Sequence, residues 1–170
     1  MAQVESLGAA VLTISDSRTP AEDTSGDLLC ELLSADGHHL VDRALVPDDV
    51  YRIRAQASAW IVNPQVSVIL TTGGTGFTGR DSTPEALSVL FDKTIDGFGE
   101  LFRQLSFDEI GASTIQSRCV GGIANGTLIF ALPGSSNAVR TGWEKILTHQ
   151  LDINFKPCNF VELIPRFLER

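Results

Sequence analysis

The sequence predicts an α/β fold with a mostly parallel sheet, and two observations carry that prediction. Strand-like apolar runs alternate with segments of helical periodicity, an order that favours parallel strands covered by helices on both faces. The first run, 9–15, is apolar almost throughout, as expected of a strand buried on both sides. Asn125-Gly126 joins two later apolar runs and predicts a hairpin, which adds an antiparallel element at one side of the sheet.

The expected elements follow in order along the chain. A helix that Gly37 would cap follows the first strand, and Pro47-Asp48 opens a second helix that stops by Pro64. A later helix carries Trp143 on its apolar stripe. We expect strands at 9–15, 39–46, 66–72, 119–124 and 127–132, and helices at 24–36, 48–63, 84–91, 97–107 and from 138 onward.

Length and charge limit the classes of function. With 170 residues and 43% hydrophobic content, the chain suits a single domain over 1–170. A net charge of −8 and a pI near 4.7 disfavour binding to nucleic acid or to an anionic membrane. No basic leader and no apolar stretch of about 20 residues is visible, so we expect a cytoplasmic protein. Its partners are then small molecules or proteins.

The cysteines and histidines predict no metal site. Cys30, Cys119 and Cys158 are scattered, without the close pairs of zinc or redox motifs, and are expected to be small buried apolar residues. His38 and His39 are adjacent and would point to opposite faces of a strand, while His149 lies far away in a predicted helix.

The segment 66–76 indicates an anion site. An apolar run ends in Thr72-Gly73-Gly74-Thr75-Gly76, which exposes backbone N–H groups, and Asp81 precedes Ser82-Thr83-Pro84-Glu85, a typical helix start with a hydroxyl cap. Loop donors and a helix N-terminus favour phosphate, and Asp81 offers a ligand for Mg²⁺. A P-loop is disfavoured because Arg80-Asp81 replaces its Lys-Ser/Thr. A dinucleotide fingerprint and a purely structural turn remain as alternatives.

Similar loops follow the other parallel strands. In such folds ligands bind outside the carboxyl ends of the strands, so residues 15–18, 47–49, 71–81 and 133–137 are expected to meet at one pocket. Hydroxyls and glycine N–H groups there would bind a phosphorylated ligand. The acids available for a divalent ion are Asp16, Asp48, Asp49 and Asp81.

With these motifs in this order, the chain resembles the molybdopterin-binding MoaB/MogA family over nearly its whole length. The motifs are Thr13-Ile14-Ser15-Asp16, Asp23-Thr24-Ser25-Gly26, Val46-Pro47-Asp48, Thr72-Gly73-Gly74-Thr75-Gly76 with Asp81 and Thr83-Pro84-Glu85-Ala86, Gly97-Phe98-Gly99-Glu100, Ser117-Arg118 and Leu132-Pro133-Gly134-Ser135. Further segments, such as Ser106-Phe107-Asp108-Glu109-Ile110-Gly111 and Pro157-Cys158-Asn159-Phe160, look like the MoaB branch of that family.

The resemblance implies a three-layer α/β/α fold, assembled as trimers or hexamers, that binds molybdopterin. Catalytic members adenylylate its phosphate with Mg²⁺ and ATP, and their two important aspartates correspond to Asp48 and Asp81. We assign Asp81 to Mg²⁺, and Asp48 to Mg²⁺ or to a water bound to it. Other molybdenum-cofactor enzymes are further candidate partners. The residues expected to bind phosphate, pterin or nucleotide are Ser15, Asp16, Thr72, Gly73, Gly74, Thr75, Gly76, Ser117, Arg118, Pro133, Gly134, Ser135 and Ser136.

Simpler interpretations stay open beside these. Asp48 would also serve as a helix N-cap, with Asp49 as its competitor for the functional role. Arg118 is alternatively a solvated charge or a subunit contact, Ser135 and Ser136 are alternatively helix caps, and Trp60 and Trp143 fit core packing better than pterin stacking.

The last loop departs from several relatives. It reads Pro-Gly-Ser-Ser where they have Pro-Gly-Asn-Pro or Pro-Gly-Gln-Pro. A molybdopterin adenylyltransferase is therefore one hypothesis, and a non-catalytic, chaperone-like molybdopterin-binding oligomer is the other. A nucleotide-binding oxidoreductase, the third, would need a nicotinamide or flavin.

Overall fold

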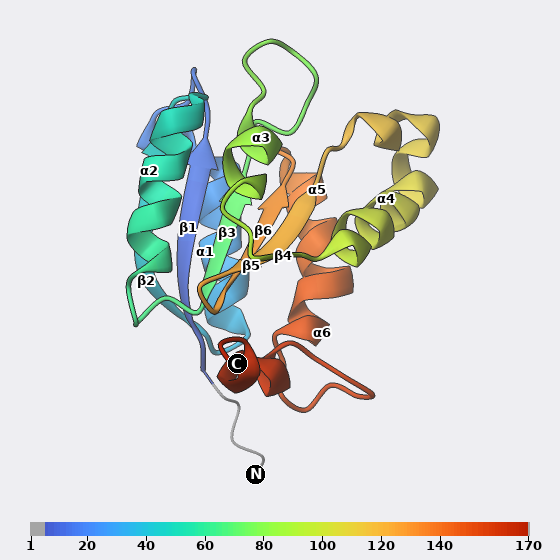
Figure 1. Ribbon diagram of the computed structural model, residues 1–170. Coiled ribbons are helices and arrows are strands. Elements are labelled where there is room, and N and C mark those ends of the chain that lie inside the picture. Colours follow the sequence, from blue (N-terminus) through green and yellow to red (C-terminus); the bar gives the residue numbers. More distant parts are fainter. Residues whose placement is uncertain (1–5, 170) are drawn as a thin grey trace.

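The computed structural model describes residues 6–169, which build one six-stranded sheet in the order β2-β1-β3-β6-β5-β4 (Figure 1). Strands β2, β1, β3 and β6 are parallel to one another, and β5 is antiparallel to both of its neighbours. The strand bounds are β1 Gly8–Ile14, β2 His39–Val46, β3 Val68–Thr72, β4 Lys93–Thr94, β5 Val120–Ala124 and β6 Thr127–Leu132. The expected mostly parallel sheet with an antiparallel side is confirmed.

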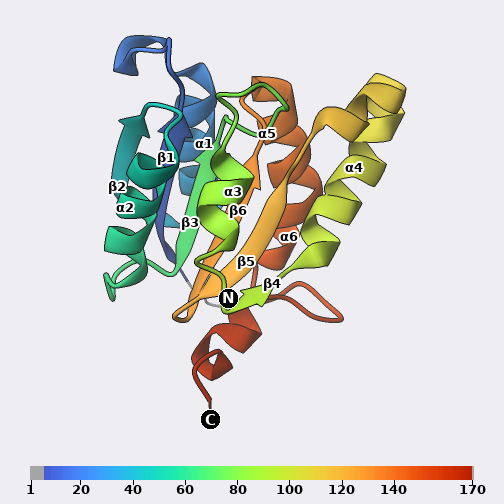
Figure 2. The same cartoon turned by 45° about the horizontal axis from the view of Figure 1, so that its top comes forward.

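Helices cover both faces of the sheet, so the three-layer architecture is confirmed as well. Helices α2 (Val50–Ile61) and α3 (Thr83–Ser88) lie on one face. The opposite face carries α1 (Thr24–Ala35), α4 (Asp96–Ile110), α5 (Ser136–Gly142) and α6 (Thr148–Gln150), as Figures 1 and 2 show. Short 3-10 segments η1 (Pro20–Glu22), η2 (Gly111–Gln116) and η4 (Val161–Arg166) and a π-helical turn η3 (Trp143–Leu147) complete the elements.

The central strands are buried on both sides because each face supplies a separate apolar cluster. In β1, Ala9 and Val11 pack into the cluster under α1 and α5, whereas Ala10 and Leu12 pack under α2. Such strands are apolar throughout, which explains the continuous run in the sequence. Trp60 and Trp143 are each at most 3% exposed, so both tryptophans belong to the core, as expected.

The hairpin between β5 and β6 follows its sequence signal. Asn125 has φ 48° and Gly126 has φ 82°, the left-handed pair that a type I′ turn needs, and Asn and Gly adopt it with little strain. The resulting antiparallel pair aligns Ala124 with Thr127. The predicted turn residues therefore set the register of this edge of the sheet.

Some expectations needed correction. The helix predicted at 84–91 ends at Ser88, and the chain then turns into β4, a strand of two residues that was not predicted. The C-terminal η4 was not predicted either. Cys119 is buried, Cys30 is only partly buried and Cys158 is exposed, so the expectation of three buried cysteines was wrong for Cys158 and is met only in part by Cys30. Between residues 6 and 169, no helix is long and apolar enough to cross a membrane.

Candidate functional site

The loops after β1, β2, β3 and β6 meet at one end of the sheet, where the loop after β3 projects at the top of Figure 1. These strands run parallel and in register, with Thr13 beside Thr72 and Thr72 beside Leu132, so their carboxyl ends lie side by side. The loops enclose a cleft of about 540 Å³ lined by Ile14, Ser15, Asp16, Ser17, Arg18, Asp48, Gly73, Gly74, Thr75, Gly76, Arg80, Asp81, Gln116, Ser117, Pro133, Gly134 and Ser135. The structure thus brings all four predicted loops together.

Three of the predicted site residues lie outside this lining. Thr72 is fully buried, and its hydroxyl donates to the carbonyl of Pro133 at 3.1 Å, which ties the loops after β3 and β6 together. Ser136 is the first residue of α5, and Arg118 lines a neighbouring hollow. Ser135 has both roles considered for it, because it lines the cleft and its Oγ caps α5 by accepting from Ala138 N–H at 3.1 Å.

The glycine loop adopts a backbone that only glycine accommodates well. Gly73 has φ 103° and Gly74 has φ 66°. A Cβ on Gly73 would stand 2.1 Å from the carbonyl oxygen of Ile14. The loop therefore crosses directly over the end of β1, which keeps its backbone at the floor of the cleft.

Asp48 is held inside the cleft by the start of α3. Its Oδ1 accepts from the N–H of Ser82 at 3.0 Å and from the Ser82 hydroxyl at 2.6 Å. The hydroxyl predicted to cap α3 thus binds Asp48 instead, and no side-chain cap is formed there. Asp48 is 7% exposed, and burial together with repulsion from Asp81 and Asp16 raises its pKa against the effect of the Ser82 hydrogen bonds.

Asp49, the competitor for the same role, caps α2. Its Oδ1 accepts from the N–H groups of Tyr51 and Arg52 at 3.1 and 2.9 Å. Asp49 is absent from the cleft lining, whereas Asp48 is part of it. The interpretation of Asp48 as a plain N-cap was therefore wrong, and the two neighbouring acids have separate functions in the fold.

Asp81 closes the end of the glycine loop. Its Oδ2 accepts from the N–H and the hydroxyl of Thr78 at 2.9 and 2.7 Å. The hydrogen bond from the Thr78 hydroxyl is the main reason that the pKa of Asp81 is lowered, and the nearby charge of Arg118 lowers this pKa further. A Cβ on Gly76 would stand 2.8 Å from Oδ2 of Asp81, and one on Gly74 would stand 2.7 Å from Oδ2 of Asp48. The glycines thus leave room for both carboxylates against the loop.

Arg118 holds the glycine loop in place through hydrogen bonds to its backbone. Its guanidinium donates to the carbonyls of Gly76 and Asp81 at 2.8 and 3.1 Å and forms an ion pair with Glu85. The guanidinium also lies over the ring of Phe77, 5.0 Å from its centroid. These contacts show Arg118 as a residue that shapes the loop.

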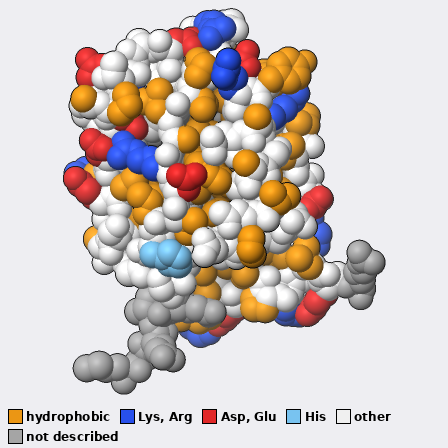
Figure 3. All heavy atoms as spheres, turned by 90° about the vertical axis from the view of Figure 1, so that its left-hand side faces the viewer, with side chains coloured by type: hydrophobic (Ala, Val, Ile, Leu, Met, Phe, Trp, Pro, Cys, Tyr) orange, Lys and Arg blue, Asp and Glu red, His pale blue; other side chains and the backbone are white. Residues whose placement is uncertain are grey.

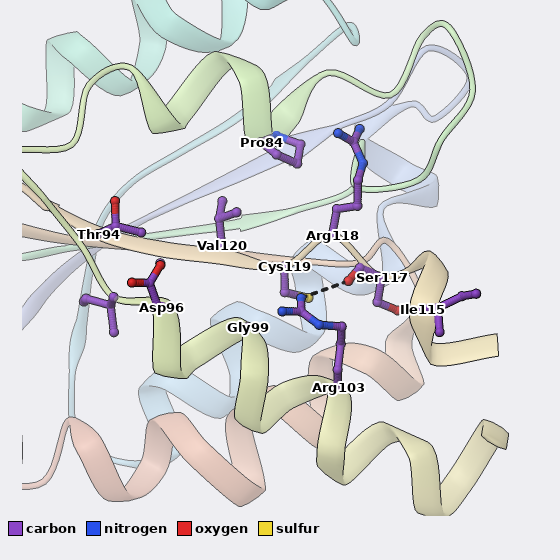
Figure 4. A pocket seen from close by; sticks show the side chains of 12 residues that line it. Pro84, Thr94, Asp96, Gly99, Arg103, Ile115, Ser117, Arg118, Cys119 and Val120 are labelled. Atoms are coloured by element: carbon purple, nitrogen blue, oxygen red, sulfur yellow. Dashed lines mark hydrogen bonds between the residues drawn. The ribbon is translucent and has the colours of Figure 1, made fainter. Parts of the chain in front are cut away.

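A second hollow of about 390 Å³ adjoins the cleft at Ser117, which lines both. In Figure 4 the side chain of Arg103 reaches it from α4, on the side opposite Arg118. Arg103 donates to the carbonyl of Ser117 at 3.3 Å. Asp96 and Thr94 lie at the far end. A ligand larger than a phosphate group therefore has space to extend past Ser117.

Two arginines of the cleft were missed as site residues. Arg18 donates to the carbonyl of Gly134 at 2.8 Å and to the Ser25 hydroxyl at 2.6 Å, and so links the loops after β1 and β6. Arg80 forms a bidentate ion pair with Asp16, with two hydrogen bonds, across the mouth of the cleft. Their positions within the predicted loops were the available signal, but a single sequence does not show which arginines turn inward.

The donor set fits Mg²⁺ only when a ligand completes it. In residues 6–169, no group of three His, Cys, Asp or Glu side chains is close enough to hold a metal alone. Mg²⁺ is commonly held by one or two carboxylates together with substrate phosphates and water. No hydrogen bond from the described residues reaches Oδ2 of Asp48, so this oxygen is free to bind a cation. Asp48 and Asp81 fit that pattern.

Comparison with known proteins matches this architecture to one family. The family model described as "Probable molybdopterin binding domain" matches residues 10–152, a range that contains every cleft residue. The chain is 56% identical over 151 residues to Molybdenum cofactor biosynthesis protein B of Escherichia coli (strain K12), covering 89% of both chains. The protein of the same name from Bacillus cereus is 46% identical over 142 residues, covering 83% of this chain and 84% of its own.

Solved structures of similar proteins share the fold. A crystal structure of Molybdenum cofactor biosynthesis protein B superposes with a TM-score of 0.84 at 44% identity, covering 86% of this chain and 92% of its own. The tungsten cofactor synthesizing protein MoaB from Pyrococcus furiosus gives a TM-score of 0.77 at 38% identity, covering 85% of this chain and 92% of its own.

Proposed function

This chain belongs to the family of molybdenum cofactor biosynthesis protein B, and from that membership we propose that it binds molybdopterin and transfers AMP from ATP to the molybdopterin phosphate. Molybdenum cofactor biosynthesis is the function of the family. The observation that carries the finer proposal is the position of two carboxylates, Asp48 and Asp81, against one glycine loop.

The cleft suits the phosphates of both substrates. The loop backbone at Gly74 and Gly76 lines the cleft, where glycine presents N–H groups without intervening side-chain bulk. The neighbouring hollow past Ser117 provides room for a ring system attached to a phosphate. Preorganised donors of this kind stabilise charge that develops during phosphoryl transfer.

In the proposed reaction, an oxygen of the molybdopterin phosphate attacks the α-phosphorus of ATP. The new P–O bond forms as the bond from the α-phosphorus to the bridging oxygen breaks, and pyrophosphate leaves with the bonding electrons. Asp48 and Asp81 would hold Mg²⁺, which supplies charge neutralisation on the phosphates when bound. The loop held by Arg118 orients the phosphates, and the ionised state of Asp48 is needed because a protonated carboxyl binds a cation poorly.

A labelling experiment tests the transfer. The purified protein is incubated with molybdopterin, Mg²⁺ and α-labelled ATP, beside an Asp81→Asn variant. We expect label on the pterin and release of pyrophosphate, both reduced about 100-fold or more in the variant, because it loses a charge beside the reacting phosphates.

The alternative function gives a different result. Pterin binding without label in the parent protein would assign the chain to the non-catalytic, chaperone-like class. Label that persists unchanged in Asp81→Asn would leave the adenylyltransferase proposal standing but remove Asp81 from the mechanism.

Self-association is part of the same proposal. The apolar side chains of Phe107, Ile110 and Ile115 on α4 and η2 are 57%, 46% and 72% exposed. Exposed apolar side chains on consecutive elements of the chain are typical of an interface between subunits. We expect sedimentation velocity to give the mass of a trimer or hexamer, and a monomer at micromolar concentration would contradict this. Cytoplasmic location and other molybdenum-cofactor enzymes as partners stay predictions.

A further inference from the structure

We propose that Arg80 is a phosphate-binding residue of the cleft, that Asp16 occupies its guanidinium in the free protein, and that ligand phosphate displaces the Asp16 carboxylate. This inference rests on the proposed function and assigns a role to a residue that the mechanism above does not use. It also changes the role of Asp16 from a binding residue to a competitor of the ligand.

The geometry of the pair is that of an anion-binding fork. Arg80 donates from Nε to one oxygen of Asp16 and from Nη2 to the other, both at 2.8 Å. A guanidinium presents this pair of parallel donors to a carboxylate or to a phosphate with equal ease. Asp16 is therefore a carboxylate located where a phosphate group fits.

The pair lies at the solvent-facing mouth of the cleft. The side chains of Arg80 and Asp16 are 63% and 40% exposed, and both residues line the cleft. Figure 3 shows positive and negative side chains next to each other at the top of this side of the molecule. An exposed pair of this kind contributes little to folding, so a ligand displaces it at small cost.

The other arginines around the cleft are committed to the protein itself. Arg18 donates to Gly134 and Ser25, and Arg118 donates to Gly76 and Asp81 and pairs with Glu85. For Arg80, the hydrogen bonds found within residues 6–169 go to Asp16 alone. The Arg80 side chain is 63% exposed, so it has space to move away from Asp16.

The carboxylate remains after displacement and has a partner of its own. Oδ1 of Asp16 also accepts from the N–H of Asp48 at 3.0 Å, which anchors the side chain without Arg80. Hydrogen bonds from Arg80 and Asp48 hold the pKa of Asp16 at about 2, so it is ionised near neutral pH. In the free protein it neutralises Arg80, and it repels incoming anions.

Binding of inorganic pyrophosphate, measured by titration calorimetry without divalent cations, tests the exchange. We expect Arg80→Gln to weaken binding about 10- to 100-fold, because it removes two charged hydrogen bonds. Asp16→Asn is expected to strengthen binding about 3- to 10-fold, because an amide retains the acceptor for Asp48 N–H but neither repels the anion nor holds Arg80 as firmly. In the Arg80→Gln background, Asp16→Asn is expected to strengthen pyrophosphate binding by a smaller factor.

A merely structural pair would give the opposite sign for Asp16. If Asp16→Asn weakens pyrophosphate binding as Arg80→Gln does, or if Arg80→Gln leaves it unchanged, the inference is overturned. The Nε–H NMR signal of Arg80, assigned by its loss in Arg80→Gln, is expected to shift as pyrophosphate is added. A signal that stays in place while the protein binds pyrophosphate would also overturn it.

The test separates this inference from the proposed function. Labelled product together with unchanged binding in Arg80→Gln would remove the inference and keep the adenylyltransferase. Arginine-dependent pyrophosphate binding without labelled product would keep the inference and leave a binding protein. A parent protein that binds no pyrophosphate would overturn the inference and count against the phosphate-binding loop.

Discussion

Replacing Gly73 with alanine is expected to lower the free energy of unfolding by about 2 to 5 kcal/mol. An alanine at φ 103° is strained, and its Cβ would lie 2.1 Å from the carbonyl oxygen of Ile14, which the central strand β1 holds in place. Neither the loop nor the strand has freedom to move, because Gly73 N–H also donates to the Leu132 carbonyl at 3.0 Å. Urea-induced unfolding of Gly73→Ala against the parent measures the loss.

Gly79→Ala is the matched control in the same loop. A Cβ there would meet nothing within 4 Å, so its unfolding free energy is expected to stay within about 0.5 kcal/mol of the parent value. Equal stabilities for the two variants would show that the backbone at Gly73 relaxes easily, and that the close approach to β1 does not restrict the loop.

The fold was predictable because its strongest sequence signals are local. The apolar run of β1 reflects burial between two helical layers, and Asn125-Gly126 sets a turn that few other pairs adopt. β4 lacked such a signal, since its two residues are exposed and are ordered by pairing with Ile123 and Gly122. The short pairing depends on tertiary contacts, which periodicity does not report.

The site was predictable in location but only partly in detail. Parallel strands bring their following loops together, and this topological rule identified the cleft. The rule gives no side-chain directions, so it left Asp48 and Asp49 as equals and missed Arg80. In the structure, contacts between residues distant in sequence give these details. Ser82 binds Asp48 and so distinguishes it from Asp49, and Asp16 holds Arg80 at the cleft.

The two acids at the start of α2 are expected to differ sharply in function. Asp48→Asn is expected to reduce labelled product about 100-fold or more, because a neutral amide does not attract the cation that the proposed transfer needs. Asp49→Asn is the control, since asparagine also caps helices well, and its activity is expected to stay within about 3-fold of the parent. Equal losses in both variants would contradict the separation of roles.

Asp48→Asn is expected to leave the free energy of unfolding at pH 7 unchanged or slightly higher. Burial raises the pKa of Asp48 above its ordinary 3.8, so the folded protein holds this proton more tightly than the unfolded chain. The contribution of Asp48 to stability therefore falls as the pH rises from the ordinary value through the raised pKa. Asparagine removes that fall, and its oxygen still accepts from the N–H and the hydroxyl of Ser82. Thermal unfolding of Asp48→Asn from pH 4 to pH 8 measures the difference from the parent.

A parent protein that gains stability over Asp48→Asn as the pH rises would contradict this prediction. The ionised carboxylate would then stabilise the fold, and the loss of product in the variant would have a structural cause.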